Sequence, residues 1–165
     1  MKLSQHVLLS ALAGALIYIA ERNIVLSSVF FLSAVFIDLD HLLDYFIFYH
    51  PKDFFHPFQF IRERLGFFLS CSWFRGKVVL VFHSFELLAV LFVLGAIYSR
   101  AVFFIALGMA FHLSLDIFWN VIIKNRSKRI TFYFISYRAA KGFECRKLLS
   151  HYMEKIDKEA ELAAG

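Results

Sequence analysis

The chain has 165 residues, of which 60% are hydrophobic, and its formal net charge is +5. Soluble domains are about 45–50% apolar, so this composition and a mean hydropathy of +0.65 argue against a soluble protein and indicate a membrane protein. In such a protein an excess of positive charge first reports orientation, and we expect no nucleic-acid partner. The length allows one domain.

Four apolar segments are expected to cross the bilayer as helices: residues 3–20, 24–48, 77–98 and 101–123. Each approaches or exceeds the roughly 20 residues that are needed to span the hydrocarbon. The first is expected to be a retained helix rather than a signal peptide, because His6 interrupts it and no clear cleavage site follows. The sequence therefore predicts an all-α membrane protein in which residues 1–123 form a four-transmembrane-helix bundle.

Two segments lie outside the predicted spans. Residues 49–76, between the second and third spans, mix Phe and Trp with Lys and Arg, which is typical of a segment that lies in the membrane interface. Residues 124–165 are basic and helical in pattern from about Phe143. We expect them to form a solvated tail.

The distribution of charge predicts the orientation. The side of the N-terminus, the loop at 49–76 and the tail holds 16 of the 18 Lys and Arg residues, and the opposite side holds only Arg22 and Arg100. The positive-inside rule places the richer side in the cytoplasm, with both termini. The basic loop and tail are expected to contact membrane lipid, in particular anionic lipid.

Ionisable residues interrupt all four apolar segments. A carboxylate in the bilayer costs roughly 3 kcal/mol and usually faces a bundle interior or a polar cavity. At 1.5 Å of rise per residue, every one of these residues lies in the cytoplasmic half of its helix. The residues are His6 in the first span, Asp38, Asp40 and His41 in the second, His83 and Glu86 in the third, and His112 and Asp116 in the fourth.

The spacing of these residues predicts a metal site. His112 and Asp116 are four residues apart, and Asp38 and His41 are three apart, so each pair shares one helix face. Asp38 and Asp40 point about 200° apart on an unbroken helix, so either the helix breaks or they serve different ions. Carboxylates and neutral imidazoles are ligands for divalent metals, whereas separate ion pairs are the competing interpretation. The expected ligands are His6, Asp38, Asp40, His41, His83, His112 and Asp116.

The motifs Asp38-Leu39-Asp40-His41 and His112-Leu113-Ser114-Leu115-Asp116 resemble a known family. It consists of small prokaryotic inner-membrane proteins described as membrane-bound metal-dependent hydrolases, which are distantly similar to the zinc-dependent phospholipase C and P1 nuclease group. The family commonly has Pro before the first Asp, where this chain has Ile37. The resemblance implies a multi-pass protein of a prokaryotic inner membrane and a metal-dependent activity.

The expected function is hydrolysis of an ester or phosphoester at the cytoplasmic side, with a lipid-linked substrate as one option. One or two Zn²⁺ ions, or Mn²⁺ or Fe, would supply the reactive hydroxide, with Asp40 or Glu86 as general base. Two other readings stay open. One is a non-catalytic metal-binding membrane protein, such as a sensor, adaptor or metal transporter, and the other is a di-iron redox enzyme. The sequence does not decide the oligomeric state.

Overall fold

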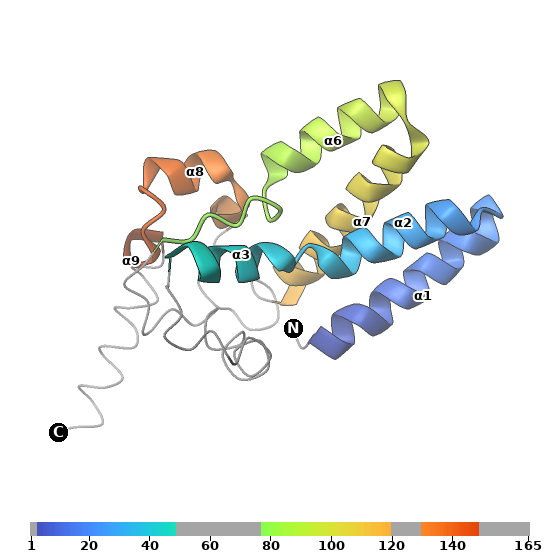
Figure 1. The fold of residues 1–165 in the computed structure, drawn as a ribbon, viewed down its shortest axis with the longest axis horizontal. Helices are drawn as coiled ribbons and strands as arrows, with labels where there is room; N and C mark the ends of the chain where they lie inside the picture. The colour runs from blue at the N-terminus through green and yellow to red at the C-terminus, as the bar shows by residue number, and fades with distance from the viewer. Residues whose placement is uncertain (1–2, 49–76, 120–129, 149–165) are drawn as a thin grey trace.

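The computed structural model describes residues 3–48, 77–119 and 130–148 (Figure 1). The predicted interfacial loop at 49–76 and the end of the tail lie outside these residues. All regular elements in the described part are helices, which confirms the all-α prediction, and a single bridge of β type joins Lys77 to Glu144. The helices are α1 (Leu3–Glu21), α2 (Ile24–Phe36), α3 (Leu39–Phe48), α6 (Phe85–Tyr98), α7 (Arg100–Ile117), a 3-10 turn (Ile130–Tyr133), α8 (Ile135–Ala140) and α9 (Cys145–Leu148).

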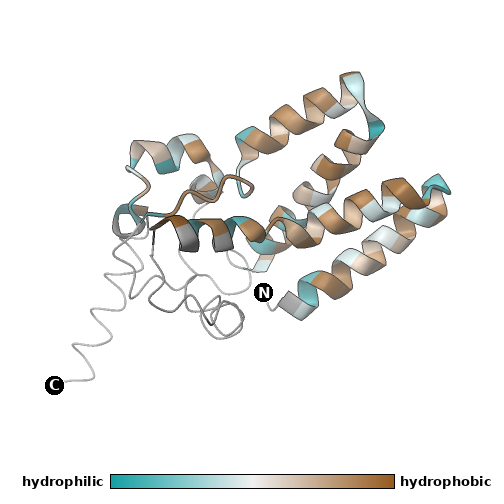
Figure 2. Cartoon of the chain, in the orientation of Figure 1, coloured by the Kyte–Doolittle hydropathy of each residue, from teal (hydrophilic) through white to brown (hydrophobic). Residues whose placement is uncertain are grey.

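Three of the described helical stretches are long and apolar enough to cross a membrane: Ser4–Glu21, Ile24–His41 and Arg100–Ile117. The shorter helix α6 is equally apolar, and brown apolar ribbon runs along α1, α2, α6 and α7 in Figure 2. Many of the apolar side chains point outward; Leu16, for example, is 67% exposed. Outward-facing apolar side chains on long helices are typical of a membrane protein.

The long helices form two hairpins, α1–α2 and α6–α7, whose turns lie at the same end of the molecule (Figure 1). The first turn is tight because the Asn23 side chain accepts hydrogen bonds from the backbone N–H groups of Val25 and Leu26 and so caps α2. An ion pair between Arg100 and Glu21, 2.6 Å long, joins the two turns. The short connection makes the two helices of each hairpin antiparallel, and the ion pair holds the two turns at the same end.

The two hairpins meet where α2 packs against α7. A Cβ atom at Gly108 would overlap the carbonyl oxygen of Phe30 and the hydroxyl of Ser33, so only glycine permits this close approach. One helical turn later His112 lies on the same face of α7, and its Nδ1 is 2.7 Å from the carbonyl oxygen of Ala34. Gly108 therefore brings His112 against the end of α2.

Two of the predicted spans are not continuous helices. The second ends at Phe36, turns at Ile37 and Asp38, and begins again at Leu39 as α3, although no proline stands there. The third was predicted to be helical from residue 77, and that helix start is wrong: α6 begins only at Phe85, where the Ser84 hydroxyl accepts from the backbone N–H of Leu87. The fourth, α7, ends at Ile117, and residues 120–123 lie outside the described part.

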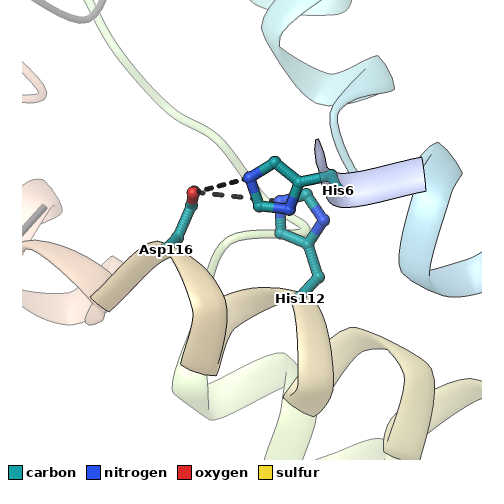
Figure 3. Close-up of side chains that lie close together, drawn as sticks. All are labelled: His6, His112 and Asp116. Atoms are coloured by element: carbon teal, nitrogen blue, oxygen red, sulfur yellow. Dashed lines mark ion pairs between the residues drawn. The ribbon is translucent and has the colours of Figure 1, made fainter. Parts of the chain in front are cut away.

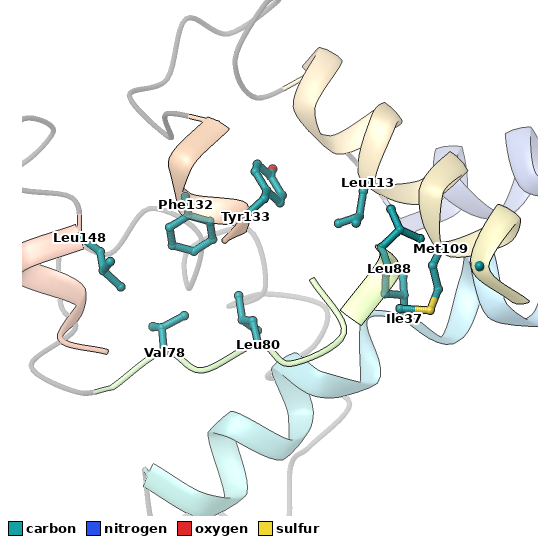
Figure 4. Packing of buried hydrophobic residues seen from close by; sticks show 10 residues of the cluster. Ile37, Val78, Leu80, Leu88, Met109, Leu113, Phe132, Tyr133 and Leu148 are labelled. Atoms are coloured by element: carbon teal, nitrogen blue, oxygen red, sulfur yellow. The ribbon is translucent and has the colours of Figure 1, made fainter. Parts of the chain in front are cut away.

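The larger of the two apolar clusters in the described part extends from the α6–α7 hairpin past the hairpin ends that lie opposite the turns (Figure 4). It joins four parts of the chain and includes Ile37 from the break after α2. Val78 and Leu80 come from the irregular segment before α6, and Leu88 and Leu113 from the hairpin. The segment predicted as a solvated tail also contributes buried side chains, namely Phe132, Tyr133 and Leu148. The described part of the tail therefore packs into the body of the protein.

Candidate metal centre

The segment at residues 77–84 is irregular, and four of its side chains are buried, those of Val78, Leu80, His83 and Ser84. Carboxylates from α3 satisfy part of its backbone. Asp44 of α3 accepts hydrogen bonds from the N–H groups of Val79 and Leu80, 2.6 and 3.1 Å long. Asp40, one turn earlier, accepts from the N–H groups of Phe82 and His83 at 2.9 and 3.2 Å. Because buried backbone groups need partners, these two carboxylates replace the missing helix or sheet and fix His83 in space.

Six of the seven predicted ligands come together between the helix ends. They come from four parts of the chain: the start of α1, the break after α2 together with the first turn of α3, the segment before α6, and the end of α7. Their ligand atoms form two groups, each within 4.8 Å, one made of His6, His112 and Asp116 and the other of Asp38, His41 and His83. Each group therefore holds two imidazoles and one carboxylate.

The two most buried imidazoles, those of His83 and His112, are each oriented by an acceptor at Nδ1. Asp40 contacts Nδ1 of His83 at 3.0 Å, and the Ala34 carbonyl contacts Nδ1 of His112 at 2.7 Å. Ala34 is one of the last four residues of α2, whose carbonyls lack helical partners. A carboxylate and a carbonyl only accept, so Nδ1 is the donor in both rings, and in the neutral imidazole each Nε2 then carries the lone pair.

Both of these Nε2 atoms face the same carboxylate oxygen. Asp38 Oδ1 is 3.4 Å from Nε2 of His83 and 3.4 Å from Nε2 of His112, and it is 3.8 Å from Nε2 of His41. Among the described residues, the Nε2 atoms of His83 and His112 have no hydrogen-bond partner, although both side chains are buried. Buried polar atoms are rarely left without a partner, so these two indicate a missing one.

Asp116 completes the opposite side of the cluster (Figure 3). Its Oδ1 lies 3.2 Å from Nε2 of His6, and its Oδ2 lies 3.8 Å from Nε2 of His112 and 3.9 Å from Nε2 of His83. The rings of His6 and His112 stack with centroids 4.3 Å apart. The two oxygens of Asp116 thus face different imidazoles.

The spacing of these atoms fits a divalent ion. Zinc binds imidazole nitrogen and carboxylate oxygen at about 2.0–2.2 Å, which places neighbouring ligand atoms of a tetrahedral site roughly 3.3 Å apart. The contacts between Asp and His in the two groups run from 3.2 to 3.8 Å. The six residues therefore fit divalent ions in donor type and in spacing, with three protein ligands in each group.

The two predicted general bases have other partners. The Glu86 oxygens accept from the backbone N–H groups of Ile135 and Ser136 and from the Ser136 hydroxyl, so this carboxylate caps the start of α8. Asp40, also predicted as a ligand, holds the far edge of the His83 ring and two backbone N–H groups. These contacts assign Asp40 to positioning, and they give neither carboxylate a proton-transfer role.

Sequence reasoning missed one residue of the site entirely. Arg138 of α8 is fully buried and donates to the carbonyl oxygens of Leu80 and His83. Nothing in the sequence distinguishes Arg138 from the other basic residues of the tail; only its apolar neighbours Phe132, Tyr133 and Phe134 hint at burial. Comparison with known proteins adds no guide, since no family model, curated protein or solved structure matches the chain.

Proposed function

We propose that this protein is a membrane-embedded, metal-dependent hydrolase that acts on an ester or phosphoester at the cytoplasmic side. One observation carries the proposal: two buried Nε2 atoms, with no hydrogen-bond partner in the described part of the chain, face one oxygen of Asp38 at equal distances of 3.4 Å. A cation between these atoms would satisfy all three. Ion pairing explains them less well, because 3.4 Å is long for a charge-assisted hydrogen bond.

The two groups would each hold one divalent ion, with zinc first and manganese or iron as alternatives. Two imidazoles and one carboxylate are a ligand set of catalytic zinc sites, which keep one position for water or substrate. An ion held there would polarise an ester or phosphoryl oxygen and would lower the pKa of a bound water toward 7. The chain's own part is to hold the ligands: Asp40 and the Ala34 carbonyl fix the tautomers of His83 and His112.

A second arrangement is a single ion on Asp38, Asp116, His83 and His112, whose contacts run from 3.4 to 3.9 Å. Four protein ligands close a zinc site, and closed sites are structural. The protein would then be a non-catalytic metal-binding membrane protein. The number of ions per chain separates the two arrangements.

We infer that all four predicted spans cross a prokaryotic inner membrane with both termini in the cytoplasm. Helix α6 has 14 residues and rises only about 21 Å, less than the roughly 30 Å of hydrocarbon. The irregular segment before it can extend the crossing, because irregular backbone is tolerated at membrane depth where protein groups satisfy it. Asp40, Asp44 and Arg138 supply those groups.

A lipid-linked substrate fits the position of the site better than a soluble one. His6 lies in the first turns of α1, and His112 and Asp116 lie in the last turns of α7, so the cluster is near one end of the apolar helices. That depth matches ester and phosphoester linkages of lipids, and the Lys and Arg residues that the sequence predicts on the same side would attract anionic headgroups. The resemblance to membrane-bound metal-dependent hydrolases supports the metal rather than any one substrate.

Hydrolysis of phospholipid and of polyprenyl phosphate, each assayed with Zn²⁺ and Mn²⁺, tests the proposal. We expect product release that depends on metal and is lost in Asp116→Asn, while Arg100→Gln, changed at the opposite end of the hairpins, stays active. If metal is bound but the native protein and Asp116→Asn are indistinguishable on both lipids, the hydrolase reading is wrong. The site is then structural or sensory.

A further inference from the structure

Arg138 is buried in a way that is costly for a guanidinium group. Its exposed fraction is 0%, and in the described part of the chain it forms no ion pair, while its Nε has no hydrogen-bond partner. Its carbon Cζ lies 5.5 Å from the centre of the Phe132 ring. Burying a charge without a paired partner is unfavourable, so a residue of this kind calls for a specific task.

Two hydrogen bonds from the guanidinium group indicate what Arg138 does. Arg138 donates to the carbonyl oxygen of His83 at 3.1 Å and to that of Leu80 at 2.9 Å. A guanidinium presents its donors in a rigid fork, so two carbonyls bound at once fix both position and angle of the backbone between them. That backbone is the turn that carries the His83 imidazole.

Two carboxylates bind the opposite edge of the turn that Arg138 binds. Asp44 and Asp40 of α3 accept the N–H groups of residues 79, 80, 82 and 83, whereas Arg138 of α8 takes the carbonyls. The turn is thus held from both sides by charged side chains of opposite sign. Its Leu80 has a left-handed φ of 46°, a conformation that a free segment would leave.

We propose that Arg138 is a positioning residue of the metal centre: by holding the carbonyls of Leu80 and His83, it keeps Nε2 of His83 directed at Asp38. The inference rests on the proposed metal site and adds that the α8 segment completes it. Because His83 belongs to the group with Asp38 and His41, loss of Arg138 should weaken the ion in that group and spare the ion held by His6, His112 and Asp116.

Cobalt titration of the detergent-purified full chain tests the proposal, because Co²⁺ reports coordination by its visible spectrum. We compare the native protein with Arg138→Met, which keeps an unbranched side chain without the donors, and with Arg138→Lys. The matched control is Lys141→Met, since Lys141 is an exposed cation just past α8. Helical content and melting of the chelated protein establish that each variant is folded.

For Arg138→Met we expect the dissociation constant of one Co²⁺ ion to rise about 10–100-fold, as for other residues that support ligands, with the second ion unchanged. Arg138→Lys should lie between, because an ammonium is a point charge that lacks the fork. If Arg138→Met does not fold, Arg138→Lys decides by the same readout. Native affinity and spectrum in the folded variant, or equal weakening of both ions, would overturn the inference, whereas no binding by the native protein would overturn the proposed function.

Discussion

Replacing Asp40 by asparagine tests whether Asp40 sets the tautomer of the His83 imidazole. Both Asp40 oxygens lie 3.0 Å from Nδ1 of His83, and one also accepts the N–H groups of Phe82 and His83. Asparagine has the same shape, and its remaining oxygen can keep the two backbone bonds. Its amide nitrogen only donates, so Nδ1 of His83 must become the acceptor and the ring proton moves to Nε2.

A protonated Nε2 cannot bind a metal, so Asp40→Asn should weaken the ion at Asp38, His41 and His83. Loss of such a supporting residue costs about 10–100-fold in affinity, which equals about 1.4–2.7 kcal/mol. Isothermal titration of the chelated protein with Zn²⁺ measures the change. Asp44→Asn is the control, because it makes the same substitution one turn along α3, where the carboxylate holds only Val79 and Leu80.

The reasoning would be refuted by equal zinc affinities for the native protein and a folded Asp40→Asn variant. His83 would then not depend on Asp40 for its tautomer. Equal losses in Asp40→Asn and Asp44→Asn would instead show that the whole turn, rather than the imidazole, had been disturbed.

Two further predictions concern packing and topology. Gly108→Ala should destabilise the fold by about 1–3 kcal/mol in thermal unfolding, because its Cβ would overlap the Phe30 carbonyl, whereas Gly14→Ala, which meets atoms only at 3.5 Å and beyond, should be tolerated. A reporter that is active only outside the cytoplasm, fused to residue 165, should give no signal, and a strong signal would reverse the orientation.

The approach of the six ligands to one another could be predicted from helix lengths and residue spacing in the sequence. Short turns make hairpins, and the rise per residue then places His6, Asp38, His83 and His112 at similar depth. The spacing of four between His112 and Asp116 puts them on one face of α7, as the structure has them. Periodicity and rise suffice wherever a ligand lies on a regular helix.

Where the backbone is irregular, the same reasoning fails. The sequence pattern predicts that His83 lies inside a helix, but in the structure it lies in a turn that Asp40, Asp44 and Arg138 hold. The hydrogen bonds of this turn join distant residues; Arg138 and Leu80, for example, are 58 positions apart. Glu86 shares a helical face with residue 83 only if the helix begins earlier than Phe85. Long-range side-chain contacts decide both cases, and no local pattern encodes them.

The directions of Asp38 and Asp40 could not be predicted from the sequence, because they depend on how the chain packs after α2. On an unbroken helix the two side chains would point in different directions. The break at Ile37 and Asp38 lets Asp38 contact Nε2 of His83 while Asp40 contacts Nδ1 of the same ring. The family resemblance offered proline as the helix breaker, and this chain breaks without it. The bonds from Asp40 and Asp44 to the turn at residues 79–83 stabilise the new direction of α3.

The central claim is that two groups of ligands bind two divalent ions. Metal analysis of the protein, purified gently in detergent without chelator, tests it most directly. The account predicts two equivalents of zinc, or of manganese or iron, per chain, falling in His112→Ala while Arg100→Gln keeps both. One equivalent would contradict the two-ion arrangement, and a native protein free of divalent metal would contradict the metal centre itself.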